Sequence, residues 1–137
     1  MVFRNTSQFD VIFAFDILEH LVYFSWLLKN IHLMLKENGI VVIGLPIDIN
    51  LSTKVKLLAS RNIFNPFRSV HGHINLFSYS EVKHELQTVH GLNLLGIRRL
   101  GLGYGLYDKK FKLNLLANVF PSLCSRVYLV YQKSEHI

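Results

Sequence analysis

Two short apolar runs, separated by a segment with a helical stripe, dominate the first third of the chain. Phe9–Phe15 (FDVIFAF) and Ile40–Leu45 (IVVIGL) are rich in β-branched and aromatic residues, which is typical of strands buried on both faces of a parallel sheet. The residues between them predict an amphipathic helix ended by Asn38-Gly39, because apolar side chains recur there every three or four positions: Ile17, Leu21, Phe24, Leu28, Ile31 and Leu35. Strand, helix and strand with tight connections predict a βαβ unit with parallel strands.

Weaker patterns follow this unit. Residues 52–61 have the spacing of a short helix with Val55 and Leu58 facing inward. Residues 65–77 show little periodicity and are expected to form a loop. Ser78 and Glu81 have the spacing of a capping box in front of another helix, which Gly91 is expected to end.

The last third of the chain predicts two more strands, Leu92–Leu100 and Arg126–Gln132. The spacing of Phe111, Leu115 and Val119 predicts a short amphipathic helix between them, which Pro121 would end. The order of elements indicates an α/β protein without an internal domain boundary.

Composition narrows the classes of function. The net charge is +6, from 15 Lys+Arg against 9 Asp+Glu, but the positive residues are scattered, so we expect no nucleic-acid partner. No apolar run reaches the roughly 18 residues of a transmembrane helix, and the polar start of the chain does not resemble a signal peptide. The single cysteine, Cys124, excludes an internal disulfide and favours a cytoplasmic location.

Several segments resemble the class I S-adenosylmethionine-dependent methyltransferase family. FDVIFAFDILEHL (Phe9–Leu21) is similar to the family segment in which an apolar strand ends in an acidic residue and a Leu-Glu-His-Leu-like helix start follows. Leu27–Pro46 resembles the next helix, turn and fifth strand, with Glu-Asn-Gly in place of the usual Pro-Gly-Gly. HINLFSYSEV (His73–Val82), the His-Gly-Leu turn at residues 90–92 and the closing RVYLVYQK complete the match.

The resemblance implies a partial Rossmann-like sheet with flanking helices. Its strands would match the family's fourth to seventh, with the last strand antiparallel. Residues 1–137 would form a single C-terminal methyltransferase-like domain truncated at its N-terminal side, with a core of residues 9–100 and 125–133 and an insertion at 101–124. The family's opening strand and Gly-x-Gly-x-Gly turn, where the backbone approaches the cofactor, have no counterpart before Phe9. Gly101, Gly103 and Gly105 spell that motif, but no helix start or acidic residue suits it there, so we interpret them as a loop.

By resemblance, the expected function is methyl transfer from S-adenosylmethionine to a small-molecule or sugar–lipid acceptor. The cofactor site would be incomplete in this chain, and the chain alone would be inactive. Strand Phe9–Phe15 would then be an exposed hydrophobic edge that pairs with a missing N-terminal half or with a second copy. The alternative is a non-catalytic methyltransferase-like module that associates with a partner, or with itself, through this edge.

The candidate site lies where the first strand ends, because ligands of doubly wound sheets bind beyond the carboxyl ends of the strands. By resemblance, Phe15, Asp16 and Leu18 border the cofactor. Asp16 and Glu19 also have the spacing of a helix cap. His20 is the expected general base and His73 the second catalytic candidate, in a loop that would close over the site; the alternative for both is an ordinary polar residue.

A divalent ion is the alternative use of these side chains. Asp16, Glu19, His20 and His73 offer oxygen and imidazole ligands, a chemically reasonable set. Some members of the resembled family use a Glu-x-x-Glu-His motif with Mg²⁺ to orient substrate hydroxyls, and this chain has Asp-x-x-Glu-His. Leu-Glu-His is also common in relatives that need no metal. We therefore expect no metal and keep Mg²⁺ as the alternative.

Overall fold

The computed structural model describes residues 8–59, 73–86, 89, 91–101 and 113–134. Within these ranges the strands β1 (Phe9–Phe15), β2 (Leu35–Pro46), β3 (Leu92–Gly101) and β4 (Cys124–Lys133) form one sheet in the order β1-β2-β4-β3. The described helices are α1 (Phe24–Met34), α2 (Leu51–Ala59), α4 (Tyr79–Leu86) and α5 (Leu113–Val119), with 3₁₀ turns η1 (Leu18–His20) and η2 (Pro121–Leu123). None of the described helices has the length and hydrophobicity needed to cross a bilayer.

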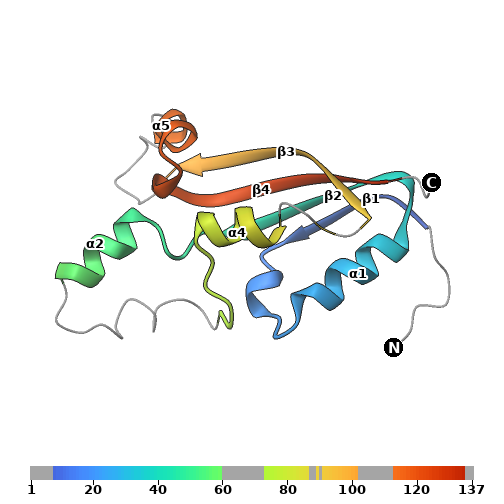
Figure 1. Ribbon diagram of the computed structural model, residues 1–137, viewed down its shortest axis with the longest axis horizontal. Coiled ribbons are helices and arrows are strands. Elements are labelled where there is room, and N and C mark those ends of the chain that lie inside the picture. The colour runs from blue at the N-terminus through green and yellow to red at the C-terminus, as the bar shows by residue number, and fades with distance from the viewer. Residues whose placement is uncertain (1–7, 60–72, 87–88, 90, 102–112, 135–137) are drawn as a thin grey trace.

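The strand directions confirm the predicted partial Rossmann-like α/β sheet. β1 pairs in parallel with β2, with Ile12 opposite Val41 and Ala14 opposite Ile43. β4 runs antiparallel to both of its neighbours, β2 and β3. Consequently β1, β2 and β3 all point the same way, and their carboxyl ends meet at one edge of the sheet (Figure 1).

The hydrophobic core lies on the face of the sheet that α1 and α4 cover. The connections from β1 to β2 and from β2 to β3 advance in the same direction across the sheet, and right-handed crossovers then place α1 and α4 on the same face (Figure 1). Leu28 and Ile31 of α1 and Val82 and Leu86 of α4 are buried there. They share a core with one row of sheet side chains: Ala14, Val41, Ile43, Leu45, Val127, Leu129 and Tyr131.

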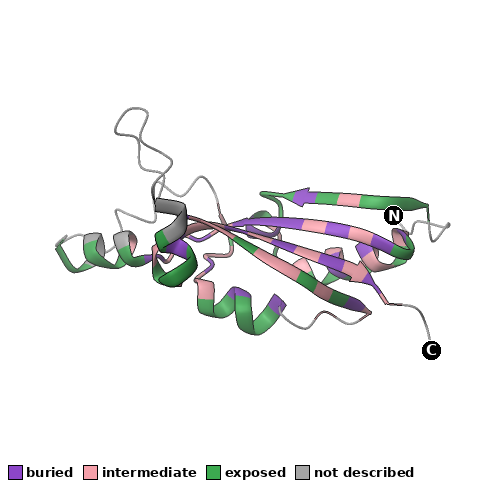
Figure 2. Cartoon of the chain, turned by 90° about the horizontal axis from the view of Figure 1, so that it is seen from above, coloured by how far each residue is buried: buried purple, intermediate pink, exposed green. Residues whose placement is uncertain are grey.

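The opposite face of the sheet is open around β1 in the described part of the chain. Phe13 of β1 stands beside Val42 and Val130 in register, and Phe15 beside Gly44 and Tyr128. Phe13 is 63% exposed, and β1 is largely exposed along its length (Figure 2). The expectation that FDVIFAF is buried on both faces is therefore wrong, because none of the described helices packs closely against β1 on this face. The expectation of an exposed apolar edge strand agrees with this position at the end of the sheet.

The helix predicted between the first two strands is shorter than expected and broken. After η1 the backbone of Leu21 is extended, and α1 starts only at Phe24. The helix ends at Met34 rather than at Asn38-Gly39, because Leu35 already pairs with Phe9 in the sheet. Asn38, with φ of 62°, instead belongs to an irregularity within β2, where the partner of β1 jumps from Leu35 to Ile40.

The helix predicted after Ser78 begins as expected but ends earlier than expected. The Ser78–Glu81 capping box is confirmed: the Glu81 N–H donates to Ser78 Oγ (3.2 Å), and the Ser78 N–H donates to Glu81 Oε2 (2.8 Å). The helix it starts, α4, is described over Tyr79–Leu86 and ends before Gly91, because Val89 already forms a β-bridge with Leu92. Gly91 has φ of 75°, a left-handed conformation that suits the turn before β3.

The predicted inward face of α2 is wrong. Val55 is 54% exposed and Leu58 is 90% exposed, because no described element covers that side of the helix, which lies at the far end of the molecule (Figure 1). The helix before Pro121 is confirmed as α5, while Phe111 lies outside the described residues. Gly101 ends β3, and the rest of the proposed glycine loop, Gly103 and Gly105, also lies outside the described residues.

Candidate functional site

The chain turns sharply where β1 ends. Asp16 has φ of 53°, a left-handed conformation that aspartate tolerates better than most residues, and its N–H donates to the Gly44 carbonyl (3.0 Å). Its carboxylate oxygen Oδ2 lies 2.9 Å from Nη1 of Arg126. The residue that caps η1 is Ile17, and no side chain caps this turn. The predicted capping role of Asp16 and Glu19 is therefore wrong, because the Asp16 side chain points to β4 instead.

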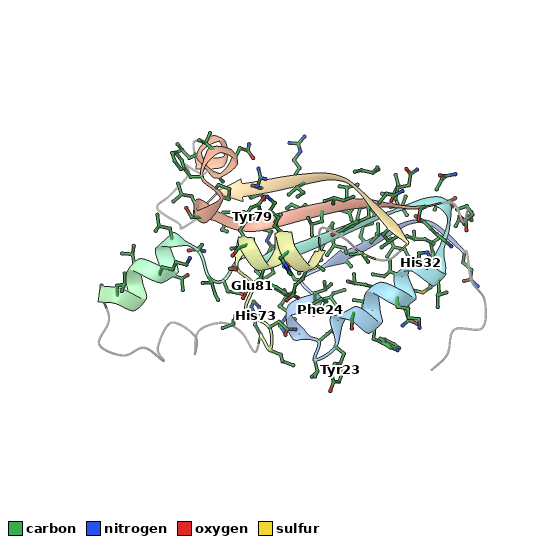
Figure 3. All side chains as sticks on the ribbon, in the orientation of Figure 1. Tyr23, Phe24, His32, His73, Tyr79 and Glu81 are labelled. Atoms are coloured by element: carbon green, nitrogen blue, oxygen red, sulfur yellow. The ribbon has the colours of Figure 1, made fainter. Side chains whose placement is uncertain are left out.

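The segment before α4 is fastened to η1. The N–H groups of Ile74 and Asn75 both donate to the Glu19 carbonyl, at 2.7 and 3.0 Å. The Asn75 side-chain amide donates to the carbonyls of Leu18 (3.1 Å) and Leu21 (2.6 Å). These bonds explain the break in the predicted helix, since the carbonyl groups of η1 are engaged by a segment more than 50 residues away. Because His73 directly precedes Ile74, these bonds also hold His73 near the turn that follows β1 (Figure 3).

Three side chains with metal-ligating atoms meet at this place: Glu19, His20 and His73. One such atom from each residue lies within 4.8 Å of the others. The imidazole rings of His20 and His73 meet edge to face, with centroids 4.9 Å apart and an interplanar angle of 79°. The structure thus brings together three of the four residues considered for a divalent ion, while the fourth, Asp16, pairs with Arg126.

Glu19 is the unusual member of this cluster. Its side chain is 1% exposed, and neither carboxylate oxygen has a hydrogen-bond partner among the described residues. Burial is the largest influence on the pKa of the Glu19 carboxyl and raises it, and the nearby Asp16 raises it further. The backbone N–H of Glu19 itself, the second-largest influence, lowers this pKa, as do His73 and His20. A buried carboxylate without a partner either binds a proton or costs several kcal/mol of folding free energy. That cost is comparable with the whole stability of a marginal domain.

Asp48 belongs to the same site, although the sequence analysis did not select it. It follows β2 by two residues, and both of its carboxylate oxygens lie 3.3 Å from Nδ1 of His73. The side chain of His73 is only 13% exposed and that of Asp48 only 10%. An acidic residue just beyond the carboxyl end of a parallel strand was the available signal, the same one that singled out Asp16.

The three residues expected beside the cofactor lie in different environments. Phe15 is 44% exposed and Asp16 is also exposed, so both can meet a ligand at the end of β1. The side chain of Leu18 is fully buried in the core beside the sheet. Any contact of Leu18 with a cofactor would therefore have to use its backbone.

A cavity of about 600 Å³ lies between α1 and α4, away from this cluster. Its lining includes Phe24, Leu28 and Val89, with Lys29, His32 and Glu85 among its polar members. It shares no residue with Glu19, His20 and His73, and it does not lie at the carboxyl ends of the strands. We therefore place the candidate site at the cluster.

The sequence matches the methyltransferase domain family over residues 2–95, more than half of the chain. No curated protein matches it. This family match covers β1, α1, β2 and the whole Glu19–His20–His73 cluster.

Two solved structures share the fold at very low sequence identity. One is a complex between the Haloferax volcanii Trm112 methyltransferase activator and a candidate methyltransferase, with a TM-score of 0.58 and 8% identity, over 97% of this chain and 57% of that one. The other is an S-adenosylmethionine-dependent methyltransferase from Archaeoglobus fulgidus, with a TM-score of 0.54 and 11% identity, over 94% of this chain and 62% of that one. The chain thus spans about three-fifths of the length of these structures. Because the family match covers residues 2–95 and the strand order and directions fit a partial Rossmann-like sheet, the chain belongs to the class I methyltransferase family.

Proposed function

We propose that this chain forms the acceptor side of an S-adenosylmethionine-dependent methyltransferase, with its site at the carboxyl ends of β1 and β2. Family membership supports the chemistry, and the strand directions support the location. Phe15 and Asp16 would border the cofactor from the exposed end of β1. Methyl transfer is a direct displacement, so the remaining task of the protein is to orient the acceptor and to take up its proton where necessary. The acceptor in this proposal is a small molecule or a sugar–lipid.

The observation that carries the proposal is the buried Glu19 carboxylate, which faces two imidazoles and lacks a hydrogen-bond partner in the described chain. A divalent cation held by Glu19, His20 and His73 would neutralise it and would orient a hydroxyl group of the acceptor. One oxygen and two imidazole ligands suit Mn²⁺, Co²⁺ or Zn²⁺ better than Mg²⁺, which prefers oxygen ligands. In this proposal His20 and His73, expected from the sequence as catalytic residues, act as ligands. Without a cation, either imidazole would serve as the base for the acceptor proton.

Calorimetric titration of the chain with Mn²⁺ tests the cation site. We expect one site in the wild type and loss of measurable binding in His20→Ala. His84→Ala is the matched control and should bind as the wild type does, because His84 is exposed on α4 and lies outside the cluster. A wild-type chain that binds no Mn²⁺ at millimolar concentration would contradict the cation site and would favour the acid–base role of the two histidines.

We further propose that part of the S-adenosylmethionine site comes from a polypeptide segment that pairs with β1. Two features support this: β1 is an edge strand, and the apolar row of Phe13, Val42 and Val130 lies on the open face. A strand added in parallel to β1, followed by a helix over this row, would cover both. Calorimetry with S-adenosylmethionine tests it: we expect no tight binding by this chain alone, and tight binding would contradict the need for a second segment.

The second candidate function is a non-catalytic module that associates through β1. The same exposed edge supports it, since an unpaired apolar strand is a template for another chain. Sedimentation at increasing protein concentration separates the two candidates. Dimerisation that Phe13→Lys abolishes, together with an absence of Mn²⁺ binding, would favour the module; a monomer that binds Mn²⁺ would favour the methyltransferase.

A further inference from the structure

Asp48 lies in a rigidly held stretch of backbone between β2 and α2. The N–H of Ile47 donates to the Ser125 carbonyl (2.9 Å), and the N–H of Ile49 donates to the Phe77 carbonyl (3.1 Å). The buried Asn50 donates from its side chain to the Ile47 carbonyl (2.9 Å) and accepts from the Thr53 N–H (3.1 Å). The residues on both sides of Asp48 are thus tied to β4, to the segment before α4 and to the start of α2, so the backbone at Asp48 is held in place.

The partner of this carboxylate is equally well held. The chain just after His73 is bonded to η1 through Ile74 and Asn75. Nδ1 of His73 lies 3.3 Å from each oxygen of Asp48, and water has little access to the pair because both side chains are nearly buried. An ionised aspartate only accepts hydrogen bonds, so a hydrogen bond in this pair requires the hydrogen on Nδ1 of His73.

We propose that Asp48 is a positioning residue that holds His73 in the Nδ1–H tautomer and turns Nε2 toward Glu19 and His20. This inference rests on the proposed cation site, whose ligand atom from His73 it assigns. Imidazoles that bind metals usually donate their other N–H to a carboxylate or carbonyl group, which fixes the ring and makes the free nitrogen a stronger ligand. Asp48 supplies that carboxylate from β2, while Glu19 and His20 come from the turn after β1.

The tautomer of His73 tests the proposal without any metal. Two-bond ¹H–¹⁵N spectra of the imidazoles, recorded at about pH 8 where histidine is neutral, distinguish Nδ1–H from Nε2–H. We expect Nδ1–H for His73 in the wild type and in Asp48→Asn, whose amide oxygen still accepts the bond. We expect a shift toward Nε2–H in Asp48→Ala. Asp10→Asn is the control, because Asp10 is highly exposed and pairs with Lys36 at the opposite end of β1 from the site.

Mn²⁺ affinity gives the functional readout. Asp48→Ala should bind Mn²⁺ about 10- to 100-fold more weakly than the wild type, and Asp48→Asn should recover most of this loss. A wild-type His73 found as Nε2–H, or unchanged in Asp48→Ala, would overturn the positioning role. If His73 is Nδ1–H and responds to Asp48→Ala while the wild type binds no Mn²⁺, the positioning role holds and the proposed cation site fails.

Discussion

The ring of Phe15 meets the ring of Tyr128 edge-on across Gly44, with centroids 5.6 Å apart and an interplanar angle of 87°. Gly44 lies between them in register, on the strand that separates β1 from β4. A Cβ atom at Gly44 would lie 2.7 Å from Cδ1 of Phe15 and 2.9 Å from Cε1 of Tyr128. The lack of a side chain at this position allows the two rings to meet on the open face of the sheet.

Gly44→Ala should therefore destabilise the fold by about 1 kcal/mol or more, because one of the two rings must move. The matched control is Gly96→Ala on β3, where a Cβ atom would meet nothing within 4 Å. That substitution should be neutral or stabilising by up to about 1 kcal/mol, since alanine has less freedom in the unfolded chain. Urea unfolding measures both, and equal effects would contradict the ring contact.

The two faces of the sheet should respond differently to truncation. Ile43 is fully buried against α1 and α4, so Ile43→Ala should lower the free energy of unfolding by about 2–5 kcal/mol. Phe13 lies on the open face and is 63% exposed. Phe13→Ala removes more carbon atoms than Ile43→Ala but should lower the free energy of unfolding by less than about 1 kcal/mol. Urea unfolding of the two variants is the check. A larger loss for Phe13→Ala would mean that the open face is covered in solution.

The capping box of α4 predicts a pH dependence. The Ser78 hydroxyl and N–H lower the pKa of Glu81 in the folded state, so the ionised carboxylate stabilises the helix start. A lowered folded pKa means that this stabilisation is complete above the unfolded pKa and disappears as the pH falls through the folded one. Glu81→Gln should be less stable than the wild type at neutral pH, and the difference should shrink below about pH 4. Glu85→Gln, on the same helix outside the box, is the control; a difference that grows in acid would refute the assignment.

Ser78→Ala should remove the other half of the box. Its hydroxyl accepts the Glu81 N–H at the first turn of α4, and its loss should cost about 1 kcal/mol. Thermal unfolding at neutral pH measures this loss, and an unchanged melting temperature would show that α4 does not depend on its cap.

Cys124 should be inert in the folded protein. The thiol is fully buried and donates to the Arg126 carbonyl (2.9 Å), and burial raises its pKa, so little thiolate forms. Alkylation by iodoacetamide at neutral pH should be at least about 100-fold slower in the native than in the urea-unfolded chain. Rapid labelling of the native protein would place Cys124 outside the core described for β4.

Local patterns were sufficient to predict the strands and the parallel pairing of the first two, whereas the antiparallel direction of the last strand was predicted from the family resemblance. The apolar runs at residues 9–15 and 40–45 carry their own β propensity, and a connection long enough to hold a helix favours a parallel crossover between them. The Ser78–Glu81 cap is likewise a property of adjacent residues. These features depend on contacts within one element or between neighbours in sequence.

The errors at the site involve partners distant in sequence. The helix after β1 is interrupted because Asn75 binds carbonyl groups of Leu18 and Leu21. Asp16 does not cap η1 because Arg126, 110 residues away, attracts its carboxylate. His20 and His73 were predicted as site residues, and as neighbours only under the metal alternative. Asp48 was missed, since the segment that carries its partner His73 has no periodicity to reveal where it packs.

The most direct test of this account is the thermal stability of wild type and Glu19→Gln, with and without Mn²⁺. Without metal, Glu19→Gln should melt at the same temperature as the wild type or higher, because it removes a buried carboxylate that has no partner in the described chain. With Mn²⁺ at about 100 times its dissociation constant, the wild type alone should gain about 2.7 kcal/mol, a rise of several degrees. A variant that melts lower than the wild type without metal, combined with a wild type that Mn²⁺ does not stabilise, would contradict the account by showing that Glu19 serves the fold and not a bound cation.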